Sequence, residues 1–320
     1  MPENILELEN IHKVFPLRSE FGRNDEARAI DGVTLSVARG EVVGLVGESG
    51  CGKSTLGRVA LGLLPSTSGT VRFRGQDLGK LTKKELRGLR KDMQIIFQDP
   101  FASLNPRMRV RDIVTEPLVI HQLAEANELD AKAAEILKMV GLDEDTRTRY
   151  PHEFSGGQRQ RIGIARALAS KPSFVVADEP VSALDVSVQA QIINLLADLQ
   201  QDLGLSFLFV AHDLNVVRHF SDRVAVMYLG RIVELAPADE IYARPSHPYT
   251  EALLADIPVA DPTAKKKHIL LTGDIPSPTR IPPGCRFHTR CLHRFDPCDK
   301  IDPKTTDLGN GHFVNCHLRG

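Results

Sequence analysis

The sequence predicts an α/β fold in which a mainly parallel sheet carries an inserted helical subdomain and a small, irregular, cysteine-containing extension. Short apolar runs typical of buried strands alternate with amphipathic helical patterns over most of the chain. A block with only helical patterns interrupts this alternation. Beyond about residue 258 the chain gains prolines, a lysine run and cysteines. The alternation therefore predicts the sheet, and the two departures from it predict the subdomain and the extension.

In the first hundred residues, four apolar or alternating segments predict strands, at 5–15, 41–47, 69–75 and 93–98. The segment "STLGRVALGLL" predicts a helix, and it follows a glycine-rich turn directly after the second of these strands. Residues 16–28 are polar and charged, and we expect a loop there.

The rest of the large domain begins with the helical block, whose three patterns lie at 110–121, 129–142 and 155–169. A buried strand, an amphipathic helix, a second buried strand and a hairpin around Gly230 are then expected at 173–179, 188–203, 206–212 and 223–235. These elements predict a domain at 1–258 with a core of about 1–98 and 171–236, a helical subdomain of about 99–170, and an extension at 259–320.

The composition is that of a globular chain, with 320 residues, 42% of them hydrophobic, and a formal net charge of −1. A charge so close to zero gives no basic field, so we expect no nucleic-acid partner. No apolar run is long enough to cross a bilayer, and "MPENILELEN" has acids where a signal peptide has bases. These features predict a cytosolic location, where disulfides are rare and clustered cysteines more often bind metal.

The stretch "GESGCGKST", at 47–55, fits the pattern G-x-x-x-x-G-K-[ST] between a predicted strand and a predicted helix. This context favours a phosphate loop over a turn that binds nothing, because glycines let backbone N–H groups surround phosphates at a helix N-terminus. We expect Lys53 to reach the β- and γ-phosphates, Ser54 to bind Mg²⁺ and Thr55 to assist at the α- or β-phosphate. Cys51 is expected to contribute its N–H, although a thiol at a helix N-terminus can be reactive. The predicted nucleotide-binding residues here are Gly47, Glu48, Ser49, Gly50, Cys51, Gly52, Lys53, Ser54 and Thr55.

Two acids end the apolar run "SFVVADE". Asp178, at the carboxyl end of the predicted strand, is expected to bind Mg²⁺. Glu179 is then a candidate general base that polarises the attacking water. Two solvated acids at a strand end are the simpler interpretation, and the phosphate loop earlier in the chain favours the catalytic one.

The stretch "FSGGQRQR", at 154–161, resembles the signature sequence of ATP-binding cassette (ABC) ATPases. Taken alone, Ser155 would cap a helix and the two glycines would form a turn. Together with the phosphate loop and the strand-end acids, they indicate the ABC family, which usually has Leu in place of Phe154 and tolerates Phe in some branches. The resemblance implies an enzyme with a P-loop (RecA-like) core that hydrolyses ATP with Mg²⁺.

Three further residues match this family in the expected order. Phe15 matches the aromatic residue that stacks on adenine. Gln98 matches a glutamine that senses nucleotide, contributes to the Mg²⁺ site and touches the membrane partner. His212 matches the switch histidine, a catalytic residue that contacts the γ-phosphate. The simpler interpretations are a core position for Phe15 and polar strand ends for the other two.

The resemblance also implies that two such ATPases pack head to tail, with a loop such as "SALD" (182–185) between them. The signature of one subunit then covers the ATP held by the phosphate loop of the other, which excludes water from the developing charge. The signature residues expected to bind nucleotide in this way are Ser155, Gly156, Gly157 and Gln158.

The segments "RPSHPYTEALLADIP" (244–258) and "IPSPTRIPPGC" (275–285) closely resemble the C-terminal region of oligopeptide and dipeptide permease ATPases. "DPFASLNPRM" (99–108) fits the same branch, and "EPVSALDVSVQAQ" resembles the F-type ATPase of dipeptide permeases. The resemblance implies an importer subunit that couples ATP hydrolysis to uptake of di- or oligopeptides. Its implied partners are a sibling ATPase in a heterodimer, two transmembrane permeases and an extracytoplasmic peptide-binding protein. The chain is then peripheral, on the cytoplasmic face of the inner (plasma) membrane.

Other functions stay open at this point. Importers of nickel, glutathione or glycosides use similar ATPases. A soluble ABC ATPase of translation or DNA repair usually has two fused halves or a long coiled-coil insert, and a small-molecule P-loop kinase would lack "SGGQ" and the switch histidine. A redox sensor with an attached ATPase would make the tail the functional centre.

The tail carries four of the five cysteines, spaced C-x₅-C-x₆-C-x₁₇-C at Cys285, Cys291, Cys298 and Cys316. This spacing contains no C-x₂-C pair, so it matches neither a zinc ribbon nor a bacterial-ferredoxin run. Four thiolates suit a [4Fe–4S] cluster, and the resemblance favours one because members of this permease branch carry such a cluster. The alternatives are structural zinc, with a ligand from His288, His293, His312 or His317, and no metal at all. Either metal would fold a tail that has little core.

Overall fold

The computed structural model describes residues 3–18, 24–256, 271 and 273–320. The chain divides into two compact units whose segments alternate along the sequence. The first unit comprises residues 1–5, 37–41 and 80–210, and the second comprises residues 6–36, 42–79 and 211–320. Each unit is described below by itself.

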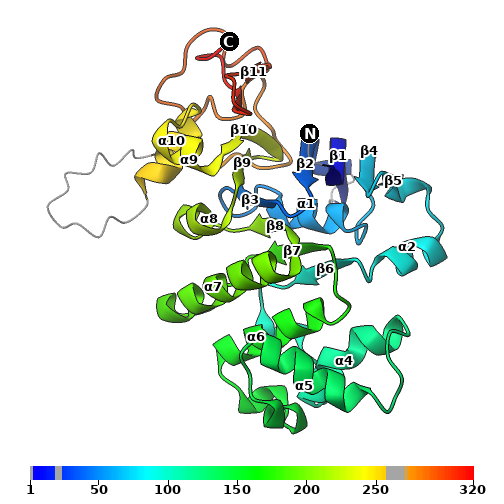
Figure 1. The fold of residues 1–320 in the computed structure, drawn as a ribbon. Helices are drawn as coiled ribbons and strands as arrows, with labels where there is room; N and C mark the ends of the chain where they lie inside the picture. The colour runs from blue at the N-terminus through cyan, green and yellow to red at the C-terminus, as the bar shows by residue number, and fades with distance from the viewer. Residues whose placement is uncertain (1–2, 19–23, 257–270, 272) are drawn as a thin grey trace, which may run out of the picture. The chain divides into compact units, whose positions relative to one another are not determined.

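The first unit is built on three parallel strands in the order β8-β7-β6, which are Ser206–Val210, Phe174–Asp178 and Met93–Ile96. Every residue of β7 and β8 is buried, as expected for apolar runs in a parallel sheet. The helices of this unit are α2 (Lys83–Leu89), α3 (Pro100–Ser103), α4 (Val110–Ile120), α5 (Leu129–Met139), α6 (Gly156–Leu168) and α7 (Val186–Leu203). Helices α4, α5 and α6 pack against one another (Figure 1) within the range where the sequence predicts a helical subdomain.

The second unit contains a sheet in the order β2-β1-β4-β5, in which β4 is antiparallel to both β1 and β5. These strands are Asn24–Ala38, Asn4–Arg18, Ser68–Phe73 and Gln76–Asp77. A further set of strands runs in the order β11-β12-β10-β9-β3, at Thr305–Asp307, Phe313–Asn315, Arg231–Pro237, Arg223–Tyr228 and Val42–Val46. Strand β3 is parallel to β9, and the other pairs in this set are antiparallel. The helices are α1 (Lys53–Ala60), α8 (Leu214–Phe220), α9 (Ala238–Ala243) and α10 (Pro248–Ala255).

The predicted loop at 16–28 is wrong where the structure describes it. Strand β1 continues to Arg18, and β2 begins at Asn24. Pairing between these long neighbouring strands satisfies the backbone there, so the polar composition does not end the strands.

The extension is less irregular than its composition indicates. Strand β12 pairs with β10, and Glu234 and Leu235 face Val314 and Phe313 across this ladder. Val314 is buried, so a short apolar stretch of the extension completes a sheet edge in the second unit. In Figure 1 the strands of the extension lie beside β10.

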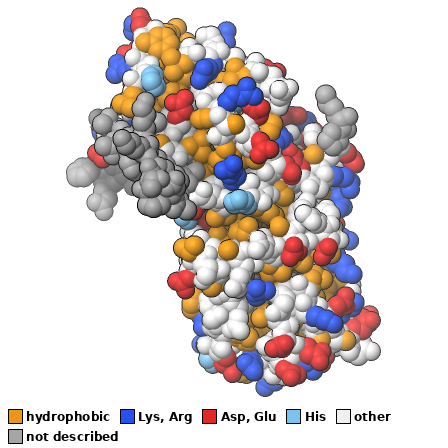
Figure 2. Space-filling model, turned by 60° about the vertical axis from the view of Figure 1, so that its left-hand side comes forward, with side chains coloured by type: hydrophobic (Ala, Val, Ile, Leu, Met, Phe, Trp, Pro, Cys, Tyr) orange, Lys and Arg blue, Asp and Glu red, His pale blue; other side chains and the backbone are white. Residues whose placement is uncertain are grey.

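Within the described residues, no helix is both long and apolar enough to span a bilayer. On the face drawn in Figure 2, the described basic and acidic side chains are interspersed, and neither sign forms a continuous patch. This distribution agrees with the net charge of −1.

Candidate functional site

The loop at 47–52 joins β3 to α1, which confirms the predicted strand–loop–helix context. Gly47 and Gly52 have φ values of 151° and 108°. A Cβ would lie 2.1 Å from the Met227 carbonyl oxygen at Gly47 and 2.2 Å from the Ala29 carbonyl oxygen at Gly52. Both the backbone conformation and the space therefore require glycine at these two positions.

Lys53 lies across this loop and is only 4% exposed. Its Nζ donates to the carbonyl oxygens of Gly47, at 2.7 Å, and Glu48, at 3.1 Å. The N-cap of α1 is Gly52, which has no side chain to cap the helix. A helix start of this kind, next to a buried ammonium group, is suited to an anionic ligand.

The Cys51 thiol is buried inside the loop. Burial raises its pKa, and the nearby Lys53 ammonium only partly opposes this effect. Cys51 is therefore an enclosed thiol whose burial disfavours the thiolate, and this environment favours a contribution from its N–H over a reactive side chain.

Three groups far along the sequence hold the loop from outside. The Glu48 N–H donates to the Tyr249 hydroxyl at 2.8 Å, and the Glu48 carboxylate accepts two hydrogen bonds from Arg290, at 2.7 and 3.0 Å. The Gly230 N–H donates to the Cys51 carbonyl oxygen at 2.9 Å. Sequence reasoning missed Gly230, Tyr249 and Arg290 in this role.

Two other predicted residues belong to the second unit. Phe15, on β1, is 36% exposed, and the Lys13 Nζ lies 5.1 Å from its ring centroid. A half-open aromatic face of this kind can stack on a base, so the interpretation as a core residue does not hold. His212 is exposed, and the next residue, Asp213, caps α8 by accepting from the Asn215 N–H.

The strand-end acids belong to the first unit. Asp178 is the last residue of β7 and is buried. Glu179 has a φ of 46°, and its N–H donates to the Val210 carbonyl oxygen at 2.9 Å. Its Oε2 accepts from the Gln98 Nε2 at 2.9 Å. The structure thus brings Gln98 and Glu179 together, and a non-glycine residue held at positive φ is common at functional sites.

The signature also belongs to the first unit. Ser155 is the N-cap of α6, and its hydroxyl accepts from the Gln158 N–H at 3.4 Å while the Gln158 Oε1 accepts from the Ser155 N–H at 3.0 Å. A Cβ on Gly157 would lie 2.5 Å from the Val188 Cγ1. Phe154 is 5% exposed, so the residue that departs from the family pattern is accommodated in the core. Ser155 itself is exposed, which leaves its hydroxyl accessible.

The predicted nucleotide residues thus fall into two groups, one in each unit. The second unit holds the phosphate loop, Phe15 and His212, and the first unit holds Gln98, Asp178, Glu179 and the signature. Within the groups, the structure shows direct contacts among the loop residues, between Gln98 and Glu179, and between Ser155 and Gln158.

The five cysteines are all free thiols. Burial, together with the charges of the other three tail thiols, raises the pKa of Cys285 to about 11. Backbone N–H groups two residues on, at Phe287, His293 and Leu318, oppose this effect at Cys285, Cys291 and Cys316. The four tail cysteines therefore form one electrostatic neighbourhood, and thiolates there need a cation or N–H donors to be stable.

Among the described residues, no group of three or more His, Cys, Asp or Glu side chains could hold a single metal ion. Three of the histidines considered for zinc each have one ring nitrogen within hydrogen-bond distance of another protein group. His312 Nε2 lies 2.8 Å from the Glu234 carboxylate, His317 Nε2 lies 2.8 Å from the Ile301 carbonyl oxygen, and His288 Nδ1 lies 2.8 Å from the Cys285 carbonyl oxygen.

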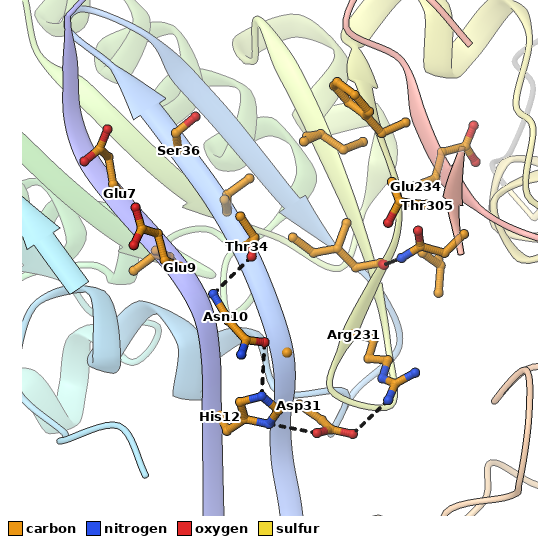
Figure 3. A pocket seen from close by; sticks show the side chains of 18 of the residues that line it. Glu7, Glu9, Asn10, His12, Asp31, Thr34, Ser36, Arg231, Glu234 and Thr305 are labelled. Carbon is orange, nitrogen blue, oxygen red and sulfur yellow. Dashed lines mark hydrogen bonds and ion pairs between the residues drawn. The ribbon is translucent and has the colours of Figure 1, made fainter. Parts of the chain in front are cut away.

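A separate cavity of about 720 Å³ lies in the second unit, lined by β1, β2, β10 and β12. In Figure 3 the Asp31 carboxylate lies between His12, at 2.9 Å, and Arg231, at 3.2 Å. Arg286 pairs with the same carboxylate. Burial alone would raise the pKa of Asp31, but Arg286 and Arg231 outweigh it and hold this pKa below its ordinary value. None of the predicted nucleotide or metal residues lines this cavity.

Comparisons with known proteins agree with this geometry. Residues 30–182 match the family model described as ABC transporter, and residues 233–298 match the oligopeptide/dipeptide transporter C-terminal region. The chain therefore belongs to the ABC transporter family and is an ATPase with the P-loop ABC fold.

Its relatives include the oligopeptide transport ATP-binding protein AppF of Bacillus subtilis, with 50% identity over 99% of this chain and 98% of the relative. A putative peptide import ATP-binding protein of Brucella ovis is 54% identical over 92% of this chain and 93% of the relative. Among solved structures, the ATP-binding cassette MJ0796, a dimer bound to ADP and Pi, has a TM-score of 0.66 and 32% identity over 73% of this chain and 98% of that one. CbiO1 of Clostridium perfringens has a TM-score of 0.65 and 29% identity over 76% of this chain and 92% of that one.

Proposed function

We propose that this ATPase is the ATP-hydrolysing subunit of an importer that takes up di- or oligopeptides. The observation that carries the proposal is a formed phosphate loop, with Lys53 folded across it, in a chain whose residues 233–298 match an oligopeptide/dipeptide transporter region. Both curated relatives described above are named for peptide transport or import, which supports peptide over nickel, glutathione or glycoside cargo. A soluble ABC ATPase without transport is disfavoured by the same match.

The phosphate loop is proposed to bind ATP through its N–H groups and Lys53, with Ser54 on Mg²⁺ and Thr55 at the α- or β-phosphate. Phe15 is proposed to stack on adenine, because its ring is half open on β1. These assignments follow from anion binding at a helix N-terminus and from the exposure of an aromatic face.

For the strand-end residues we propose that Asp178 binds Mg²⁺, that Glu179 is the general base, and that Gln98 contributes to the Mg²⁺ site. The hydrogen bond from Gln98 to Glu179 supports a shared role, because it fixes the carboxylate that has to accept a proton. His212 is proposed to contact the γ-phosphate. A bound Mg²⁺ supplies positive charge for phosphate oxygens.

The proposed partners are a sibling ATPase, two membrane permeases and an extracytoplasmic peptide-binding protein. Ser155, Gly156, Gly157 and Gln158 are proposed to cover ATP bound by the sibling, and the exposed Ser155 hydroxyl supports this. A solved relative forms a dimer, which is consistent with pairing. We place the chain on the cytoplasmic face of the membrane, as an ATPase domain at 1–258 followed by an extension at 259–320.

Reconstitution tests this function. The chain, its sibling and the permeases are placed in proteoliposomes with the binding protein, and uptake of labelled dipeptides and longer peptides is followed with ATP present. Wild type should support uptake and Lys53→Ala should abolish it, whereas Arg58→Ala, in the last turn of the same helix, should not. Uptake of nickel, glutathione or a glycoside without peptide would replace the cargo proposed here.

We also propose that Cys285, Cys291, Cys298 and Cys316 hold one structural [4Fe–4S] cluster. The four thiols influence one another electrostatically, and backbone N–H groups lie beside three of them, which is compatible with thiolates that share one metal site. The choice of a cluster over a single ion rests on the resemblance of the tail to the permease branch. The cluster would offset part of the negative charge of thiolates whose ionisation is disfavoured by burial. Iron, sulfide and zinc are measured in anaerobically prepared protein, with Cys51→Ser as the matched control.

Each variant with one tail cysteine changed to Ser should lose about four irons per chain, and its extension should become sensitive to protease. Cys51→Ser should keep its iron and a protease-resistant extension. One zinc without iron would turn the site into structural zinc. Four free thiols with no metal and an unchanged tail would end the proposal.

A further inference from the structure

The segment between the first two tail cysteines contacts the phosphate loop directly. Arg290 presents two guanidinium nitrogens to the two carboxylate oxygens of Glu48, at 2.7 and 3.0 Å. The Arg290 side chain is 7% exposed and that of Glu48 is 23% exposed. A two-bond pair of this kind fixes both distance and orientation, so it is stronger than an ordinary surface ion pair.

Aromatic packing holds this segment in place. Phe287, three residues before Arg290, lies in a buried cluster with Tyr228 and Tyr249, at centroid distances of 5.3 and 5.4 Å. Tyr249 also accepts the Glu48 N–H, so the cluster and the carboxylate pair hold the same loop residue. Backbone and side chain of Glu48 are therefore fixed by separate groups of the C-terminal region.

Arg286 makes a second, indirect connection. It donates to the Leu229 carbonyl oxygen and pairs with Asp31, and it is buried. Leu229 precedes Gly230, whose N–H donates to the Cys51 carbonyl oxygen in the loop. The tail segment thus holds the loop at Glu48 and supports the hairpin that holds it at Cys51.

We infer that residues 285–291 are a positioning element for the phosphate loop, and that Arg290 is a positioning residue for nucleotide binding. The inference rests on the proposed role of this loop in binding ATP. Glu48 carries a negative charge in a loop that has to accept a polyphosphate, and Arg290 neutralises that charge while it fixes the loop backbone. Without Arg290, the carboxylate would repel the nucleotide and its loop would lose a fixed point.

This mechanism makes a specific rescue possible. Arg290→Met removes the guanidinium and keeps a side chain that can pack on Tyr228. Glu48→Gln removes the carboxylate charge that Arg290 neutralises. If Arg290 acts through Glu48, the double variant should bind ATP better than Arg290→Met alone, which a merely structural role would not produce.

The experiment uses the full chain, prepared anaerobically, and equilibrium binding of a fluorescent, non-hydrolysable ATP analogue. Arg290→Met should weaken binding about 5- to 150-fold, the usual range for coupling between sites. Glu48→Gln in that background should restore most of the loss, and Arg290→Lys should fall between wild type and Arg290→Met. The matched control is Arg294→Met, because Arg294 lies in the same tail and pairs with Asp299 instead.

Two further measurements separate the possible causes of weaker binding of the ATP analogue. Iron and zinc content shows whether a variant still folds its tail, and hydrogen exchange of the amides at 47–52 reports the loop without any ligand. Exchange there should accelerate in Arg290→Met and stay unchanged in Arg294→Met.

The Lys53→Ala variant tests the proposed ATP site independently of Arg290. If Lys53→Ala loses binding while Arg290→Met binds as wild type, the positioning role is wrong and the ATP site stands. A loss in Arg290→Met that Glu48→Gln does not reverse also overturns the inference. If wild type and Lys53→Ala bind the analogue equally weakly, the proposed ATP site fails and this inference fails with it.

Discussion

The phosphate loop and the signature are both glycine-rich turns that start a helix, yet they are built differently. Gly52 begins α1 without a side-chain cap, and Lys53 fills the loop from within. Ser155 begins α6 with a reciprocal cap to Gln158 and is exposed. The start of α1 therefore has no side-chain cap, which suits a ligand, and other parts of the chain surround it. The start of α6 is capped by its own side chains and is exposed.

The glycines of the phosphate loop and of the signature also differ in the atoms that surround them. Gly47 and Gly52 lie against backbone carbonyl groups, which cannot move without moving a strand or a turn. Gly157 lies against the Cγ1 atom of the Val188 side chain rather than against a backbone group. A site that binds its own nucleotide needs a fixed backbone, and a surface that meets a partner's nucleotide needs access. This difference is consistent with the proposal that the phosphate loop binds this chain's own ATP and the signature meets the sibling's ATP.

The largest expected effect is on the rate of ATP hydrolysis, and the residue changed belongs to neither loop. Glu179→Gln should lower ATP turnover about 10²- to 10⁴-fold and keep ATP binding, because loss of a general base affects the transition state. The Gln98 hydrogen bond to this position can be kept by the new amide oxygen. Single-turnover hydrolysis is measured with the sibling ATPase present. Near-normal turnover would remove Glu179 from this role.

The next effect tests the signature directly. Ser155→Arg should leave ATP binding by the isolated chain within about twofold of wild type, and should lower hydrolysis at the sibling's site about 10²- to 10³-fold, as for loss of one donor to developing charge. Binding is measured on the monomer, and hydrolysis is measured in a heterodimer whose own Lys53 site is disabled. A monomer that no longer binds ATP would contradict the assignment of the two loops to different nucleotides.

A smaller effect compares the glycines. Gly47→Ala should lower the free energy of unfolding by about 3 kcal/mol, because a strained φ and contact with a carbonyl oxygen coincide. Gly157→Ala should cost about 1–2 kcal/mol, less than Gly47→Ala, because the contact is with the Val188 side chain rather than the backbone and alanine favours the helix. Gly163→Ala, with nothing near its Cβ position, should stabilise α6 by about 0.5–1 kcal/mol. Denaturant unfolding gives all three values, and equal costs for Gly47 and Gly157 would remove the contrast in rigidity.

Much of the fold follows from hydrophobic periodicity. The strands β3, β7 and β8 and the helices α4, α5 and α6 lie within or near their predicted ranges, because each carries a clear apolar run or face. The loop predicted at 16–28 failed since cross-strand pairing overrode polar composition. Helix α2 was missed although Thr82 and Glu85 form the capping box that their spacing indicates.

The site could be predicted only in part. The phosphate loop and signature were identified because their chemistry requires fixed residue types at fixed spacing. The contact between Arg290 and Glu48 joins residues 242 positions apart, and neither lies in a periodic pattern that would pair them. The bond between Gln98 and Glu179 likewise depends on the order of β6 and β7 in the sheet, which the sequence motifs do not state.

The smallest expected effect concerns the residue that departs from the family pattern. Phe154 is buried directly before the Ser155 cap, so Phe154→Leu should lower the free energy of unfolding by less than about 1.5 kcal/mol, as conservative core exchanges do. Turnover at the sibling's site should stay within about twofold, since the cap between Ser155 and Gln158 does not involve the ring. Ser155→Ala is the matched control: it should cost about 1 kcal/mol through loss of the cap and should also lower that turnover. Denaturant unfolding and heterodimer ATPase rates distinguish the two variants. If Phe154→Leu lowers turnover as much as Ser155→Ala, the phenylalanine ring as well as the exposed hydroxyl sets the geometry that the partner's nucleotide meets. The signature would then depend on a fixed backbone, as the phosphate loop does.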